Sequence, residues 1–187
     1  MSNRQSQQWW ESMRDIRRVF RYLWHRSWIA DARRNHAIEH ATIHLLSGRL
    51  PHKQIAGRST PHGFYIYGEV PTDLLEQTVR EAIFRLQSGE RQLAIHPHCG
   101  TNLVTASIMA GVATVLASAG RKRRWWDKLL AALVATTVAL TVAQPLGYWV
   151  QEHITTESSL GRTELVHIRR LSSIRIPVHF VRIAHDL

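Results

Sequence analysis

The sequence contains a single cysteine, Cys99, among its 187 residues. One cysteine cannot form a disulfide within the chain, so the redox compartment cannot be read from cysteine usage. The opening stretch, MSNRQSQQWWESMRD, has no apolar run, and we therefore expect no cleavable signal peptide. The sequence also lacks a P-loop, a dinucleotide fingerprint, a Ser/His/Asp arrangement, internal repeats and low-complexity segments. Its chemistry must therefore be sought in other motifs.

Acidic residues are scarce. The chain has 14 Asp and Glu against 24 Lys and Arg, which gives a formal net charge of +10. Such a surplus indicates an anionic partner, either nucleic acid or a phospholipid surface. Only the charge supports nucleic acid, whereas the uncharged segments described next favour lipid. We therefore expect a lipid bilayer as partner and no nucleic acid.

Two segments between residues 102 and 150 have almost no charge. The first, LVTASIMAGVATVLASAG, is rich in small residues, and the second, LLAALVATTVALTVAQPLGYWV, is long enough to span a bilayer. Trp126 and Trp149 lie 23 residues apart, roughly 34 Å along a helix, close to the separation of two aromatic belts. The pattern predicts a transmembrane helical hairpin over 102–150. Two buried helices of a soluble protein are the alternative, but so small a domain could hardly cover them.

The rest of the chain predicts an α+β fold in three parts. Residues 1–34 are basic and rich in tryptophan, which is typical of a helix at a membrane interface. Residues 35–101 combine amphipathic helices with short strands and form the predicted metal-site domain. In the tail, 151–187, SIRIPVHFVRI alternates so that Val178 and Phe180 share the apolar face, and Pro177 suggests an edge strand. We expect this strand to pack on the domain.

The stretch HAIEHATIH places His36, His40 and His44 four residues apart on a predicted helix. His36 and His40 could bind one zinc ion, or another divalent metal, through their ring nitrogens. Glu39 need not be a ligand and could accept a proton from a water that the metal activates. This H-x-x-E-H order is that of inverzincin metallopeptidases. The alternative is a histidine-rich polar stripe with no metal.

A third ligand is available in HPHCGTN, just before the first apolar segment. His96, His98 and Cys99 are the candidates, and Pro97 with Gly100 predicts a tight bend that could direct one of them towards the helix. His96 and Cys99 are preferred, while His44 and His98 are less favoured ligands. Which of them completes the site stays open at this point.

H-x-x-E-H followed by H-P-x-C-G-T and an apolar helix resembles a family of uncharacterised bacterial membrane proteins described as metal-dependent enzymes. His36, Glu39 and His40 match the first motif, and His96, Pro97, Cys99, Gly100 and Thr101 match the second. GRSTPHGFYIYGEVP and LQSGERQLAIHPHCGTN are similar to a domain of unknown function found in cyanobacteria and their relatives. The resemblance covers about residues 35–120. It implies a metal site without naming a reaction.

Two functions follow as expectations. The first is a membrane-anchored, zinc-dependent hydrolase, similar to a peptidase or amidase, in which Glu39 is the catalytic base. The second is a non-catalytic membrane subunit or assembly factor whose histidines hold a structural metal, haem or another tetrapyrrole. Its small-residue helix would pack in a larger complex or a homo-oligomer. In both cases we expect a bacterial inner or thylakoid membrane, with the soluble domain on the cytoplasmic side.

Overall fold

The computed structural model describes residues 28–97, 99–119, 124–171 and 177–185. Most of the expected interfacial helix at 1–34 therefore lies outside the described residues. The first described helix already begins at Trp28, so residues 28–34 belong to the helix that carries the histidine motif. The described elements are, in chain order, α2 (Trp28–Arg49), β1 (Ala56–Thr60), β2 (Gly63–Tyr67), α3 (Thr72–Gln87), η1 (Arg91–Ala94), α4 (Gly100–Ser118), α5 (Trp125–Val150), η2 (Gln151–Thr155), β3 (Thr163–Leu171) and β4 (Val178–His185).

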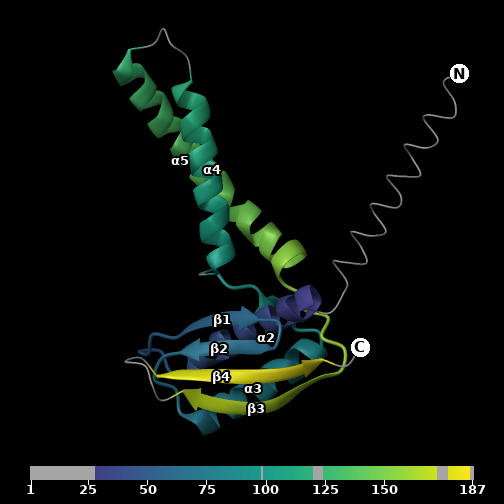
Figure 1. Ribbon diagram of the computed structural model, residues 1–187. Coiled ribbons are helices and arrows are strands. Elements are labelled where there is room, and N and C mark those ends of the chain that lie inside the picture. The colour runs from purple at the N-terminus through teal and green to yellow at the C-terminus, as the bar shows by residue number, and fades with distance from the viewer. Residues whose placement is uncertain (1–27, 98, 120–123, 172–176, 186–187) are drawn as a thin grey trace, which may run out of the picture.

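The fold is α+β, with a four-stranded antiparallel sheet in the order β1-β2-β4-β3. Helices α2 and α3 lie against one face of this sheet (Figure 1). The hairpin between β1 and β2 turns at Pro61 and His62, and Gly63 follows with φ of 141°, a conformation that favours glycine. A side chain at position 63 would also collide with the backbone carbonyl of Val181 on β4. Glycine at this position therefore allows β4 to pair with β2.

The core lies between the helices and the sheet. Helix α3 buries one stripe at helical spacing, and α2 contributes Ile38, Ala41 and Leu46, each with no exposed surface. From the sheet, Phe64, Ile66, Val181 and Ile183 close the same cluster. This packing fixes α2 against β1, which is the contact that builds the site described below.

The tail contributes two strands, and two details of the expected pattern are wrong. Pro177 precedes an interior strand, because β4 lies between β2 and β3. The face that packs on the helices carries His179, Val181 and Ile183, whereas Phe180 is half-buried against Tyr65 on the outer face. The reason is a tertiary contact: the ring of His179 reaches α3, where its Nε2 lies 3.0 Å from Thr72 Oγ1.

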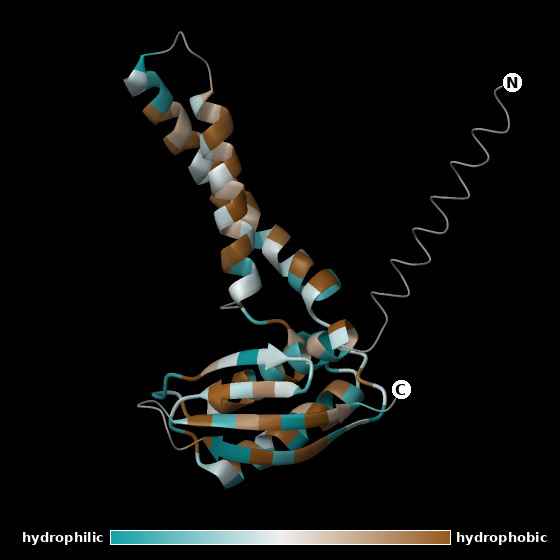
Figure 2. Cartoon of the chain, in the orientation of Figure 1, coloured by the Kyte–Doolittle hydropathy of each residue, from teal (hydrophilic) through white to brown (hydrophobic). Residues whose placement is uncertain are grey.

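Helices α4 and α5 form an antiparallel pair that projects away from the sheet and its covering helices (Figure 1). Both are long and apolar enough to cross a membrane by length and composition. Hydrophobic residues predominate along both helices (Figure 2). Large apolar side chains on their outer surface, among them Leu116, Leu133 and Val138, are more than half exposed in the isolated chain. The chain thus combines an α+β unit with a separate apolar hairpin.

Candidate metal centre

Two histidines of α2 face the end of the segment that enters α4. The rings of His36 and His40 lie 4.2 Å apart, measured between centroids, because the two residues are one helical turn apart. His36 is partly buried, and His40 is only 4% exposed. The helix therefore holds both imidazoles in a mostly water-excluded position beside the hairpin.

Backbone carbonyl groups orient both rings. His36 Nδ1 lies 3.0 Å from the carbonyl oxygen of Thr155 in η2, and His40 Nδ1 lies 2.7 Å from that of Ala94 in η1. A carbonyl oxygen can only accept, so each Nδ1 carries a proton, and Nε2 is the ring nitrogen that is free of a carbonyl contact and could bind a metal ion. This is the arrangement of histidines that ligate metals, in which the second ring nitrogen donates to a carbonyl or carboxylate.

Cys99 meets these rings from the start of α4. Its Sγ lies 3.5 Å from His36 Nε2, and the backbone N–H of Thr101 donates to Sγ across 3.4 Å. Burial raises the pKa of the Cys99 thiol, but hydrogen bonds with His36, His40 and Thr101 outweigh it and lower the pKa to about 5. The thiolate, which is the form that binds metal, is therefore favoured at neutral pH.

The ligand atoms of His36, His40 and Cys99 all lie within 4.8 Å of one another. These three side chains could hold a metal ion. Two imidazole nitrogens and one thiolate suit zinc, and the oriented Nδ1 groups supply the outer hydrogen bonds that such sites use. On donor chemistry, the residues fit a divalent metal of the zinc type.

Glu39 lies beside this group without contributing a ligand atom to it. Its side chain is buried against β1, where a Cβ added to Gly57 would come within 2.7 Å of Glu39 Cγ and Cδ. Burial raises the pKa of Glu39, although His36, His40 and a hydrogen bond with Ser59 act in the opposite direction. The Glu39 carboxyl group is therefore held in place, and its pKa is raised towards neutral pH.

A cavity of about 520 Å³ joins these groups. It is lined by α2, by β1 and the residue before it, and by the loop that leads into α4, and its lining includes His36, Glu39, His40 and Cys99. The base of the apolar hairpin forms one wall through Gly100 and Thr101. A substrate in this cavity would touch the candidate ligands and the carboxyl group together.

His96 lies near the cluster but is not one of the three grouped side chains. Its ring is 6.0 Å from that of His40, between centroids, and it lines the same cavity. Its backbone N–H donates to Gln151 Oε1 across 2.6 Å, and its carbonyl oxygen accepts from Gln151 Nε2 across 3.2 Å. Gln151 is fully buried and also contacts Asn102, so it fixes the loop that carries Cys99.

The two less favoured ligands have different outcomes. His44 is exposed and stands apart from the grouped side chains, because each step of four residues overshoots a helical turn by about 40°. The stripe of three histidines therefore supplies only two candidate ligands, and His44 is corrected to a surface residue. His98 lies outside the described residues.

Several residues that shape the site were missed from the sequence. Gln151 and Thr155 are more than 100 residues from α2, and the carbonyl of Ala94 carries no side-chain signal. Gly57 offered one signal, because a glycine inside a strand often marks the close approach of another group. Gly57 is the one that pattern reasoning could have found.

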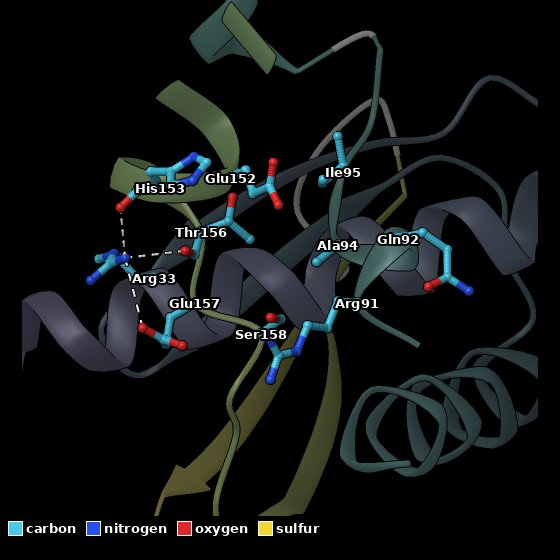
Figure 3. Close-up of a pocket in the computed structure, with 10 residues that line it drawn as sticks. All are labelled: Arg33, Arg91, Gln92, Ala94, Ile95, Glu152, His153, Thr156, Glu157 and Ser158. Atoms are coloured by element: carbon cyan, nitrogen blue, oxygen red, sulfur yellow. Dashed lines mark hydrogen bonds and ion pairs between the residues drawn. The ribbon is translucent and has the colours of Figure 1, made fainter. Parts of the chain in front are cut away.

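A second cavity, of about 490 Å³, lies between α2, η1 and the segment after α5 (Figure 3). Arg33 of α2 donates to the carbonyl oxygens of His153 and Thr156 and lies 3.7 Å from Glu157. It thereby ties the end of the hairpin to the helix that carries the histidines. The two arginines that line this cavity are balanced by Glu152 and Glu157.

One protein-family model matches most of the chain. Residues 31–168 match the model of a domain of unknown function, DUF6391. The chain belongs to this DUF6391 family. The matched range contains every residue of the candidate metal centre and both hairpin helices, and it confirms the expected resemblance to a domain of unknown function.

A relative of this chain comes from a cyanobacterium. An uncharacterized protein of Picosynechococcus sp. (strain ATCC 27264 / PCC 7002 / PR-6) is 34% identical over 165 residues, which cover 81% of this chain and 78% of the relative. No solved structure matches the chain.

Proposed function

We propose that this protein is a membrane-anchored, zinc-dependent hydrolase of the peptidase or amidase type. His36, His40 and Cys99 would hold the metal, and Glu39 would be the general base. One observation carries the proposal. Glu39 lines the cavity that contains the three candidate ligands, yet it contributes no ligand atom to their group.

The placement of Glu39 suits a base. A buried carboxyl group with a raised pKa accepts a proton from water more readily than an ordinary surface carboxylate. Arg33 and Arg34 are paired elsewhere, with Glu157 and Asp31, so neither ion pair draws Glu39 away from the cavity. When bound to the three ligands, zinc would supply Lewis acidity that polarises a carbonyl group and makes water more acidic.

The number of ligands also supports catalysis over a purely structural metal. Structural zinc sites are closed by four protein ligands, whereas catalytic sites use three and keep one position open. Within the described part of the chain, the group contains two histidines and one cysteine. The adjoining cavity gives a substrate access to it.

The membrane anchor is part of the proposal. Helices α4 and α5 have the length and composition of membrane spans, and their large apolar side chains would be covered by lipid. The H-x-x-E-H and H-P-x-C-G-T motifs resemble those of the bacterial membrane proteins described as metal-dependent enzymes. We place the protein in a bacterial inner or thylakoid membrane, with the α+β unit on the cytoplasmic side.

The test uses full-length protein in lipid nanodiscs, loaded with zinc, and a mixture of randomised octapeptides analysed by mass spectrometry. Wild type should generate peptide fragments. Glu39→Gln should retain one zinc per chain and cleave about 10²–10⁴-fold more slowly, because it cannot accept a proton. Glu76→Gln, which removes a carboxylate from an ion pair on the exposed side of α3, is the matched control and should cleave normally.

Full cleavage by Glu39→Gln would overturn the role of Glu39. Zinc bound at one per chain, with neither peptides nor simple amides cleaved by wild type, would favour the other function, a non-catalytic subunit with a structural metal or tetrapyrrole.

A further inference from the structure

Strand β1 is an open edge of the sheet. In the order β1-β2-β4-β3, β1 pairs with β2 on one side, and the described residues place no strand on its other side. An edge strand presents unpaired backbone N–H and C=O groups along its length. These groups can pair with a further strand in the same plane.

The open edge of β1 borders the candidate metal centre. Successive residues of a strand point to opposite faces, and in β1 Ala56 and Arg58 are exposed while Gly57 and Ser59 are partly buried towards Glu39. All four nevertheless line the same cavity. A cavity that runs along the edge of the strand would be lined by residues of both faces in this way.

We propose that the substrate is an extended polypeptide segment that adds to β1 as an outer strand, which places one of its peptide bonds beside Glu39 and the three candidate ligands. The inference rests on the proposed hydrolase function and specifies its substrate. Main-chain hydrogen bonds to β1 would provide affinity with little dependence on side chains.

The source of that segment is a membrane-anchored polypeptide. Gly100 and Thr101, which line the cavity, form the first turn of α4. With α4 in the bilayer, β1 lies close to the membrane surface, as Figure 1 shows for its position beside the base of the hairpin. A chain that leaves the membrane in extended form could reach β1 within a few residues.

The reaction is hydrolysis of a peptide bond. The oxygen of water bonds to the carbonyl carbon, and the C–N bond breaks. The proton that Glu39 takes from water passes to the departing amine nitrogen. Water is the co-reactant, and no oxidant or reductant is needed.

The first test measures binding to the Glu39→Gln protein, which should hold peptides without cleaving them. Retained octapeptides are identified from the randomised mixture and resynthesised with a single N-methyl group at each position in turn. Pairing with β1 predicts a period of two: methylation should weaken binding about tenfold at alternate residues and change it little at those between. Uniform tolerance, or no retained peptide, would overturn the proposal.

The second test uses hydrogen exchange, and β3 is its internal control because it is the other edge of the sheet. Bound peptide should slow amide exchange at residues 56–60 and leave residues 163–171 unchanged. Protection of both edges, or of neither, would contradict pairing at β1.

The third test addresses the source. The best peptide is joined to an apolar helix of twenty residues and placed in the same nanodisc as the protein. It should bind at least tenfold more tightly than the free peptide, because the membrane raises its effective concentration near β1. Equal affinities would overturn the membrane-anchored source.

These experiments distinguish a failure of the proposed peptide pairing with β1 from a failure of the proposed hydrolase function. If wild type binds zinc and cleaves simple amides in a Glu39-dependent way, while the N-methyl scan shows no period, only the inference fails. If zinc does not bind, the proposed function itself fails.

Discussion

Gly57 of β1 lies against the carboxyl-bearing side chain of Glu39 of α2, so closely that a single added methyl group would overlap it. The added Cβ would stand 2.7 Å from Glu39 Cγ and Cδ. A strand glycine thus makes room for the proposed base. The strand and the helix that meet here are 18 residues apart in sequence at these two positions.

Gly57→Ala should therefore displace Glu39 and leave the metal ligands in place. We expect one zinc per chain and a loss of octapeptide cleavage of about tenfold or more, because a small misplacement of a catalytic group is costly. Gly48→Ala is the matched control, since an added Cβ there meets nothing within 4 Å. Zinc content and cleavage rate are measured for both, and equal activity of the two variants would contradict the role of the glycine.

The candidate metal centre predicts a sharp difference between two histidines of one helix. His40→Ala should lose zinc, because two remaining ligands hold the metal far more weakly than three. His44→Ala, one turn further along α2 and exposed, should retain one zinc per chain. Elemental analysis of the purified proteins decides this, and equal zinc in the two variants would mean that the metal lies elsewhere.

Acid should destabilise the α+β unit through two histidines of β4. Burial lowers the pKa of His179 and of His185 below the ordinary value near 6.5. Below about pH 6.5 these two histidines bind protons in the unfolded chain but stay largely neutral in the folded chain. Stability is therefore full above about pH 6.5 and falls as pH drops towards the lowered values, by up to about 1.4 kcal/mol per pH unit for each histidine.

Thermal unfolding at pH 7.5 and pH 5.5 measures this effect. His185→Gln, which can still hydrogen-bond to Thr163 and Asn35, should lose part of the difference between the two pH values. An unchanged pH dependence in this variant would show that His185 binds protons equally in the folded and unfolded states.

The bilayer should cover one of two apolar positions that are both more than half exposed in the isolated chain. Phe84 on α3 and Val138 on α5 are 69% and 58% exposed in the isolated chain. In a Cys99→Ser background, Phe84→Cys in nanodiscs should react readily with a membrane-impermeant maleimide, whereas Val138→Cys should react only after detergent denaturation. Similar labelling of both before denaturation would argue against a transmembrane α5.

Local patterns determined much of this protein. Side chains on one face recur every 3.6 residues in a helix and every 2 residues in a strand. From such periods the sequence alone indicated the amphipathic α3, the hairpin of β1 and β2, two long apolar helices and a pair of histidines one turn apart. Such signals depend on neighbours in the chain. Such local signals can also mislead: RQLAIHP has the apolar alternation of a strand, yet Arg91–Ala94 forms a 3₁₀ helix whose last carbonyl orients His40.

Only the tertiary structure decided which groups meet. It brought Cys99, 63 residues beyond His36, to the imidazole nitrogen, and left His44 outside the cluster. Gln151 and Thr155, in the segment that follows α5, secure the site, and β1 became an edge because β4 took the inner place beside β2. These contacts join residues far apart in sequence, and their geometry follows from how the helices and the sheet pack, which no local spacing encodes.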